Sequence, residues 1–197
     1  MVKNGFLKTD IDKFHSIILH GKTSLLKEIQ FWCFNYGLHC VIVFRFGQFA
    51  RKLWGKNKIL GLIPLVTYGI LNQMVIFFHH FEIAKEASIG KGFYLAHYSN
   101  IKIGPAVIGE NSMMHHNITI GMRSAQGDQG VPTIGNNVWI GTGAVISGDI
   151  TIGNNVTISA GCVISKNIPE GCLVAGNPGR VIMQNYDNSS MINYKIP

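Results

Sequence analysis

Isoleucine recurs at every sixth residue between residues 134 and 168 of this 197-residue chain. The stretch reads IGNNVW-IGTGAV-ISGDIT-IGNNVT-ISAGCV-ISKNI, and Gly or Ser follows each leading isoleucine. Neither an α-helix, with 3.6 residues per turn, nor an isolated strand, with a period of two, produces this repeat. A parallel β-helix built from hexapeptides does produce it. The pattern predicts a triangular prism in which three hexads make one coil and each isoleucine stacks on the one a coil later.

Less regular hexads extend this pattern toward the N-terminus, and we expect a left-handed parallel β-helix over residues 83–182. Residues 121–133 depart from the repeat and are predicted to form an external loop at one corner, where insertions in solenoids often carry function. The tail, residues 183–197, is polar and is expected to extend or fray. The earlier leading positions of the hexads are Ile83, Ile89, Leu95, Ile103, Ile108, Met114 and Ile120.

Residues 1–82 contain no hexads and are expected to form an α-helical N-terminal domain, so that the whole chain is mainly β with a helical beginning. Apolar residues at helical spacing predict helices over residues 10–20, 23–36 and 38–54. The next stretch, residues 59–78, is long and apolar enough to span a bilayer, but polar residues and a proline interrupt it. We expect a helical pair packed in the protein there, with contact with a membrane surface and a true span as alternatives.

The charge and the cysteine content indicate which classes of partner and which redox compartment to expect. The formal net charge is +7, but Lys and Arg are scattered, with no run longer than Arg51-Lys52. This argues against a nucleic-acid groove and favours a basic surface that attracts phosphorylated small molecules. The four cysteines lack CxxC spacing, so we expect no disulfide framework, no metal site and a reducing cytoplasm. The first residues, MVKNGFLKTD, lack an apolar segment, and no secretory signal is expected.

The repeats together with the closing stretch GNPGRVI resemble the hexapeptide acyltransferase superfamily, and within it the serine acetyltransferases and their relatives that modify polysaccharides such as colanic acid. The helical segments TDIDKF and YGLHCVIVFRFGQFARKLW, the stretch FEIAKEASIGKGFYLAH and the loop ITIGMRSAQGDQGVPTIG carry the rest of the resemblance. The resemblance implies transfer of an acetyl group from acetyl-CoA, as acyl donor, to a hydroxyl.

The resemblance also implies a histidine base oriented by a carboxylate fifteen residues earlier. The matching residues are His97 in LAHYSN and Glu82 in FEIA, where the family usually has Asp. This spacing is slightly less than one coil, so the two side chains can approach across one edge of adjacent coils, about 4.8 Å apart. A carboxylate at one ring nitrogen would support the imidazolium that forms when the other nitrogen accepts a hydroxyl proton.

Repeat spacing predicts that His97, His116, Thr142 and Ala160 form a column along one edge of the prism, with the long loop nearby. In the family, small residues along this column flank the pantetheine arm of CoA, so the resemblance makes Thr142, Gly143, Ala160 and Gly161 candidate contacts. Lys166 and Arg180 are candidates for its phosphates, with ordinary surface charge as the alternative. His115, His116 and Asp128 are further candidates near the substrate, although a subunit-interface role is preferred for the two histidines.

Departures from the serine acetyltransferases favour an acceptor other than free serine. Serine acetyltransferases hold the amino acid with an Arg-Asp-Pro motif and with an Arg-His pair in the loop, but this chain lacks the motif, and Gly130-Val131 replaces the pair. Free serine would then lack charged partners. We therefore expect a sugar acceptor in surface polysaccharide or glycan biosynthesis, which could be lipid-linked at the inner face of a membrane. The alternatives are serine O-acetylation and an inactive solenoid scaffold. The family resemblance implies a homotrimer, with a hexamer formed through the N-terminal helices as a further alternative.

Overall fold

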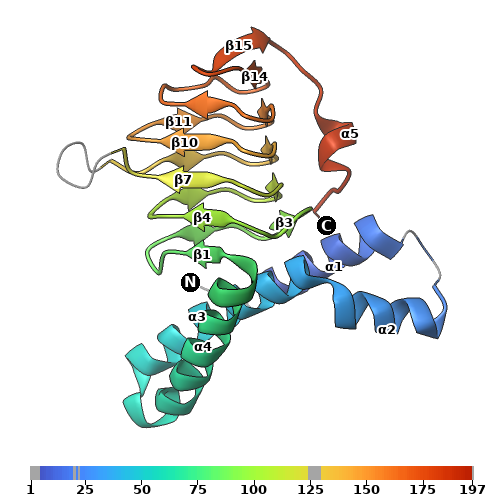
Figure 1. Cartoon of the computed structure of the whole chain (residues 1–197), viewed down its shortest axis with the longest axis vertical. Helices are drawn as coiled ribbons and strands as arrows, with labels where there is room; N and C mark the ends of the chain where they lie inside the picture. The colour runs from blue at the N-terminus through green and yellow to red at the C-terminus, as the bar shows by residue number, and fades with distance from the viewer. Residues whose placement is uncertain (1–4, 20, 22, 124–129, 197) are drawn as a thin grey trace.

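The computed structural model describes residues 5–19, 21, 23–123 and 130–196. Within these residues, helices come first and lie at one end of a three-sided parallel β-solenoid (Figure 1). The predicted fold class is confirmed. The helices are α1 (Phe6–Leu19), α2 (Leu25–Phe34), α3 (Tyr36–Lys56), α4 (Lys58–His79) and, near the C-terminus, the short α5 (Ser189–Ile192).

The strands form three sheets, each making one face of the prism. The first face contains β1 (Phe81–Ile83), β4 (Ile101–Ile103), β7 (Thr119–Gly121), β10 (Val145–Ser147) and β13 (Val163–Ile164). The second contains β2 (Ser88–Ile89), β5 (Val107–Ile108), β8 (Thr133–Ile134) and β11 (Thr151–Ile152). The third contains β3 (Tyr94–Leu95), β6 (Met113–Met114), β9 (Trp139–Ile140), β12 (Thr157–Ile158), β14 (Leu173–Ala175) and the antiparallel β15 (Arg180–Met183).

The register confirms the stacking predicted from the hexads. Ile146 lies opposite Ile164 on the first face, and Ile140 lies opposite Ile158 on the third. Both pairs are buried in the prism, where they and the other leading residues form a continuous apolar core. Because parallel strands one coil apart exchange backbone hydrogen bonds, each coil supports the next. The six-residue period therefore fixes both the fold and the position of every corner.

Asparagines stack at the corner between the second and third faces. Asn111, Asn137 and Asn155 all adopt positive φ, a conformation that Asn tolerates at turns. Their side chains bond in a ladder, with Asn111 Nδ2 2.9 Å from Asn137 Oδ1 and Asn137 Nδ2 3.0 Å from Asn155 Oδ1. The tail returns along this corner, where Asn188 Nδ2 donates to the Asn137 carbonyl. The expectation that the tail extends or frays was therefore wrong, because the ladder leaves backbone acceptors for it.

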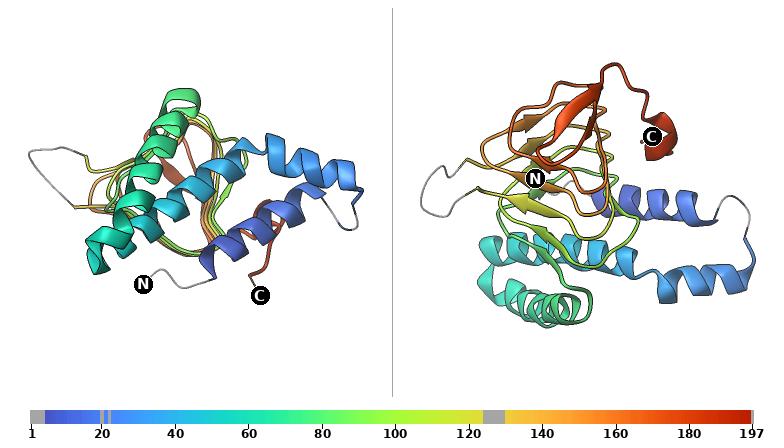
Figure 2. Two further views of the ribbon diagram at one scale, coloured as in Figure 1. Left: turned by 90° about the horizontal axis from the view of Figure 1, so that it is seen from below. Right: turned by 45° about the horizontal axis from the view of Figure 1, so that its top comes forward.

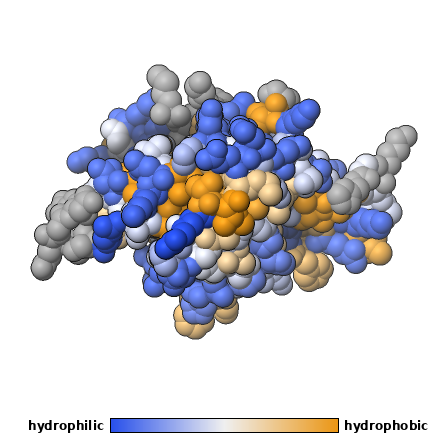
Figure 3. All heavy atoms as spheres, turned by 90° about the horizontal axis from the view of Figure 1, so that it is seen from above, coloured by the Kyte–Doolittle hydropathy of each residue, from blue (hydrophilic) through white to orange (hydrophobic). Residues whose placement is uncertain are grey.

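Figure 3 views the prism from the end that β15 closes, opposite the end with the N-terminal helices. An apolar band is visible there between hydrophilic side chains, and the apolar side chains of β15 contribute to the exposed surface. The antiparallel pairing of β15 with β14 ends the parallel stacking, because a further coil cannot pair in the same register. The exposed apolar residues of β15 are Val181, Ile182 and Met183.

The N-terminal helices cover the other end of the prism, as Figure 2 shows from below. The first coil would leave backbone carbonyls unpaired there, and buried cations satisfy several of them. Arg45 on α3 donates to the carbonyls of Ile89 at 2.8 Å and Gly90 at 2.6 Å, and pairs with Asp10 on α1 at 2.7 Å. Lys13 donates to the Gly92 carbonyl and the Asn111 side chain. Burial lowers the pKa of Lys13 to about 7, although Asp10 opposes this.

The stretch expected to be a helical pair is one continuous helix, α4, with Pro64 inside it. One stripe packs on α3, where Gly61 meets the Trp54 backbone and Tyr68 meets Gly47. The rest is exposed: only 11% of the apolar window in α4 is buried. The expectation of a stretch packed in the protein therefore holds for one stripe only. In the described chain, α4 is the one helix long and apolar enough to cross a membrane, by length and composition alone.

Replacing Gly61 by Ala tests the close approach of α3 and α4. A Cβ at this position would clash with the Trp54 backbone, which cannot move as a flexible side chain can. We expect Gly61→Ala to lower the free energy of unfolding by about 1–3 kcal/mol, measured by urea denaturation. Gly69→Ala, on the same helix with nothing within 4 Å, is the control and should be neutral or stabilising. Equal effects of the two substitutions would contradict this packing.

Candidate active site

The predicted column lies at the corner where the third face turns into the first. Leu95, Met114, Ile140 and Ile158 are in register on the third face, so the residues two positions later share one corner. Two hydrogen bonds tie the column together: Gly143 N donates to His116 O at 3.1 Å, and Gly161 N donates to Thr142 O at 2.7 Å. The structure thus brings His97, His116, Thr142 and Ala160 together along one edge.

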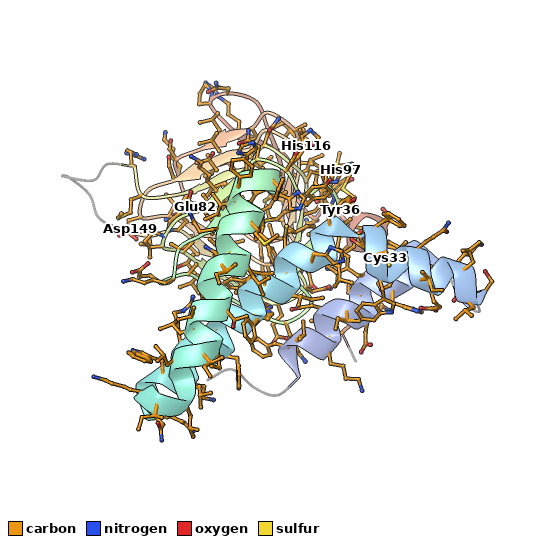
Figure 4. The ribbon with its side chains drawn as sticks, turned by 60° about the horizontal axis from the view of Figure 1, so that its bottom comes forward. Cys33, Tyr36, Glu82, His97, His116 and Asp149 are labelled. Carbon is orange, nitrogen blue, oxygen red and sulfur yellow. The ribbon has the colours of Figure 1, made fainter. Side chains whose placement is uncertain are left out.

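Histidine rings gather at the helical end of this edge. The His97 ring centroid lies 5.3 Å from that of His115 and 5.4 Å from that of His116. The His115 ring in turn lies 5.0 Å from Trp139 on β9. Figure 4 shows His97 and His116 side by side at the corner, with Tyr36 of α3 beside them. His97 is exposed, whereas His115, His116 and Trp139 are half-buried, so His97 is the ring most accessible to a substrate.

The environment favours neutral imidazole at His115. Burial lowers its pKa, and the neighbouring His97 and His116 lower it further. His116 Nδ1 is buried and has no hydrogen-bond partner among the described residues. A neutral ring accepts a proton, and an unpaired ring nitrogen can bind a polar substrate group. His115 is therefore favoured as the neutral imidazole, the form that can accept a proton.

Glu82 does not contact His97. Glu82 lies in β1 on the outward side of the first face, opposite Lys102 of β4 in the parallel register. No hydrogen bond or ion pair of the Glu82 carboxylate is present in the described part of the chain. Figure 4 labels Glu82 and His97 on opposite sides of the last turn of α4. The orienting role of Glu82 remains a prediction that would require its side chain to turn toward the corner.

A cavity of about 500 Å³ opens beside the column, between α1, α2, α3 and β3. Ala96 and Tyr98, on either side of His97 in the sequence, both line it. Tyr98 also contacts Tyr36 and His79, with ring centroids 5.4 and 4.9 Å away, so the end of α4 supports this wall. Among the described residues, Lys27 is the only charged one in the lining, and none is a carboxylate. Other lining side chains include Gln30, Phe31, Phe34, Asn35, Tyr36 and Tyr94.

Asn35 is one of the lining residues of this cavity, and its side chain carries an unpaired donor. Its Oδ1 accepts from the backbone N–H of Leu38 at 3.1 Å and caps α3. Its Nδ2 is buried without a hydrogen-bond partner in the described parts of the chain. A buried donor without a partner is unfavourable, and a bound hydroxyl or carbonyl would satisfy it. Sequence spacing gave no indication of this group, because its place in the cavity depends on how α3 meets β3.

The candidate contacts for CoA fall at two corners. Ala160 and Gly161 are exposed on the column. Gly143 and Gly161 have φ of +73° and +68°, which glycine adopts readily. Because these residues are small, this part of the edge carries no large side chain. Arg180 begins β15 opposite Ala175, near the far end of the same edge. Lys166 instead follows β13 and lies at the next corner. Asp128 lies outside the described residues.

The external loop leaves the prism at that next corner, between β7 and β8. Its described start, Arg123, donates to the Ser165 carbonyl at 2.9 Å, beside Lys166. The expectation that the loop lies near the column is therefore wrong within one chain, because the first face separates the two corners. Among the described residues, no group of three or more His, Cys, Asp or Glu side chains is placed so that it could hold a metal ion.

Comparisons with known proteins agree with this architecture. Residues 132–166 match the family described as bacterial transferase hexapeptide (six repeats). The chain is 35% identical over 150 residues to serine acetyltransferase 1, chloroplastic, of Arabidopsis thaliana, covering 71% of this chain and 45% of that one. It is 36% identical over 115 residues to WcaB of Escherichia coli K12, named for acetyl transfer in colanic acid biosynthesis, covering 56% of this chain and 68% of that one.

A solved structure extends the similarity to the helices. The serine acetyltransferase of Brucella abortus in complex with coenzyme A superposes with a TM-score of 0.72 at 25% identity, covering 91% of this chain and 67% of that one. The match spans less than half the length of three curated serine acetyltransferases, with 45%, 43% and 32% of their lengths covered. The shared part includes both the prism and the N-terminal helices.

Proposed function

Since this chain belongs to the hexapeptide-repeat acyltransferase superfamily, we propose that it is an O-acetyltransferase that moves an acetyl group from acetyl-CoA to an acceptor hydroxyl. The observation that carries the proposal is the accessible His97 at the head of a column of small residues. A hydroxyl is a poor nucleophile at neutral pH, and a histidine base activates it. CoA supplies the acyl group as an activated thioester.

In this mechanism His97 accepts the proton of the acceptor hydroxyl as the oxygen bonds to the acetyl carbon. The carbon–sulfur bond of the thioester breaks, and the departing sulfur takes that proton from the His97 imidazolium, so that acetyl ester, free CoA and neutral His97 result. His115, kept neutral by burial and by its neighbours, would not repel the imidazolium formed at His97. Exposed Ala160 and Gly161 would flank the pantetheine arm, and Arg180 would meet the phosphates.

The cavity beside His97 supports a sugar acceptor. Its aromatic walls suit the C–H faces of a sugar ring, and Gln30, Asn35 and Lys27 can bond to hydroxyls. Among the described residues no carboxylate lines it, so the ammonium group of a free amino acid would lack a charged partner there. The alternative acceptor, serine, is favoured by the names of the plant relatives and of the Brucella structure. We propose the sugar because of the lining.

We further propose a homotrimer. Within one chain the loop and the column occupy different corners, but a threefold arrangement would bring the loop of one chain to the column of the next. Lys166 would then join the site of the neighbouring chain. We also propose a cytoplasmic location at the inner face of the membrane, which agrees with the four free cysteines.

An acceptor panel tests this function. We expect acceptor-dependent release of CoA from acetyl-CoA with a nucleotide-linked or lipid-linked sugar, and little release with serine. Tyr98→Ala, which removes one aromatic wall, should raise KM for the acceptor and leave KM for acetyl-CoA unchanged. Lys85→Ala, exposed on a distant turn, is the control. Turnover of serine as efficient as that of any sugar would establish the alternative, and no turnover with any acceptor would favour an inactive scaffold.

A further inference from the structure

The outward face of α4 is apolar along its whole length. Ile59, Ile63 and Phe77 are 86%, 76% and 75% exposed, far more than a folded chain usually leaves such side chains. With Val66, Ile70 and Met74 they repeat at three- and four-residue intervals, which places them on one side of the helix. The opposite stripe, containing Gly61 and Val75, is the one that packs on the protein.

Cations without acidic partners lie at one end of this face. Lys52, Lys56 and Lys58 are exposed around the turn between α3 and α4, and Arg51 is half-buried over the Tyr68 ring. Residues 29–81 contain no Asp or Glu. None of these four cations takes part in an ion pair with a described residue. An apolar helix face with a basic rim is the surface that binds the headgroup region of anionic bilayers.

An apolar groove continues the surface from α4 onto α3. The groove has a volume of about 560 Å³ and is lined mainly by Phe6, Ile42, Phe46 and Phe49, with Thr67 and Leu71 of α4 at its edge. Phe49 is half exposed. Its walls carry few polar atoms that a protein segment could bond, and they are open to acyl chains that lie beside the helix.

The fold favours a bilayer surface over the other occupants of such a face. A second copy packed α4 against α4, in either direction, would offer no carboxylate to the cations, because the whole stretch 29–81 lacks one. A true span would have to separate α4 from α3, where Gly61 and Gly47 make close contact. The end of α4 is also tied to the prism, since Ile101 N donates to His80 O at 3.0 Å.

We propose that α4 and the basic turn that precedes it dock the protein on the surface of an anionic membrane, with α4 lying in the interface plane. The docked helix ends at His79, whose ring contacts Tyr36 and Tyr98 in the wall of the cavity. Docking therefore holds the cavity close to the lipid headgroups, where a lipid-linked acceptor would be presented. The docking itself does not depend on the proposed acetyl transfer.

Vesicle flotation with the full chain tests the proposal. We expect the protein to float with vesicles of phosphatidylcholine containing about one third phosphatidylglycerol, at least about tenfold more tightly than with phosphatidylcholine alone. The triple variant Ile59→Gln/Ile63→Gln/Phe77→Gln and the triple variant Lys52→Gln/Lys56→Gln/Lys58→Gln should each weaken binding at least about tenfold. All six side chains are exposed, so circular dichroism should show an unchanged fold.

Matched controls carry the same changes elsewhere. Leu25→Gln/Val107→Gln/Ile182→Gln removes three exposed apolar side chains, and Lys85→Gln/Lys102→Gln/Lys195→Gln removes three exposed charges. Both should bind like the wild type. The proposal is overturned if the wild type fails to float with anionic vesicles, or if the controls lose binding equally. It is also overturned if the α4 variants merely shift the mass measured by light scattering, because the face would then be a contact between copies.

Discussion

Replacing His97 by Ala is expected to lower kcat for acetyl transfer by about 10²–10⁴-fold. His97 is the exposed ring at the head of the column, whereas His115 and His116 beside it are half-buried. The loss should fall on kcat rather than on KM for acetyl-CoA, because the candidate contacts for CoA lie further along the edge. Steady-state kinetics measured by CoA release would show it. His15→Ala, on α1 beside Glu28, is the control and should leave the rate unchanged.

The variants of the neighbouring residues separate the possible roles. If Glu82 stays opposite Lys102, Glu82→Gln should lower kcat much less than His97→Ala does. If the Glu82 side chain turns to orient the His97 ring, Glu82→Gln should lower kcat as much as His97→Ala does. In the second case the double variant should be no slower than His97→Ala alone, since residues acting as a unit are not additive. A rate for His97→Ala within threefold of the wild type would remove His97 from the chemistry.

The sequence predicted the prism because one local rule repeats. Every leading residue from Ile134 to Ile164 has the same environment, so the period alone fixes register, corners and core. The column followed from the same spacing, and in the structure Gly143 N donates to the His116 carbonyl within it. The corner of the loop could also have been derived: His116 precedes the first-face strand β7, whereas the loop follows that strand.

The helical domain was less predictable because its placement depends on tertiary contacts. The segment that forms α4 is apolar on both faces, so periodicity could not show which stripe packs and which stays exposed. Gly47 and Gly61 determine which stripe of α4 packs, because their lack of a side chain lets α3 and α4 approach closely. In a sequence alone, an isolated glycine within a helix does not show whether it has this role. The cavity likewise unites residues from separate elements. Spacing placed Glu82 near His97 but could not predict the direction of either side chain.

Replacing Arg45 by Met is expected to lower the free energy of unfolding by about 3–5 kcal/mol. Arg45 is 3% exposed and Asp10 is fully buried, so the variant would remove the hydrogen-bonded ion partner of Asp10 and leave the electrostatic interaction with Lys13. The backbone N–H of Phe93 would remain as a donor to Asp10 Oδ1 at 2.8 Å. The carbonyls of Ile89 and Gly90 would lose their donor as well. Urea denaturation at neutral pH measures the change.

Two further variants identify the cause of this loss. Arg51→Met removes a half-buried arginine of the same helix whose contact is the Tyr68 ring, and it should cost less than about 1 kcal/mol. Asp10→Asn/Arg45→Met removes the Asp10 charge as well and should recover part of the stability lost in Arg45→Met. If Arg45→Met and Arg51→Met were equally mild, the buried pair would not secure the helices to the prism. The cavity lies between the N-terminal helices and β3, so other contacts would then have to hold the helices against the prism.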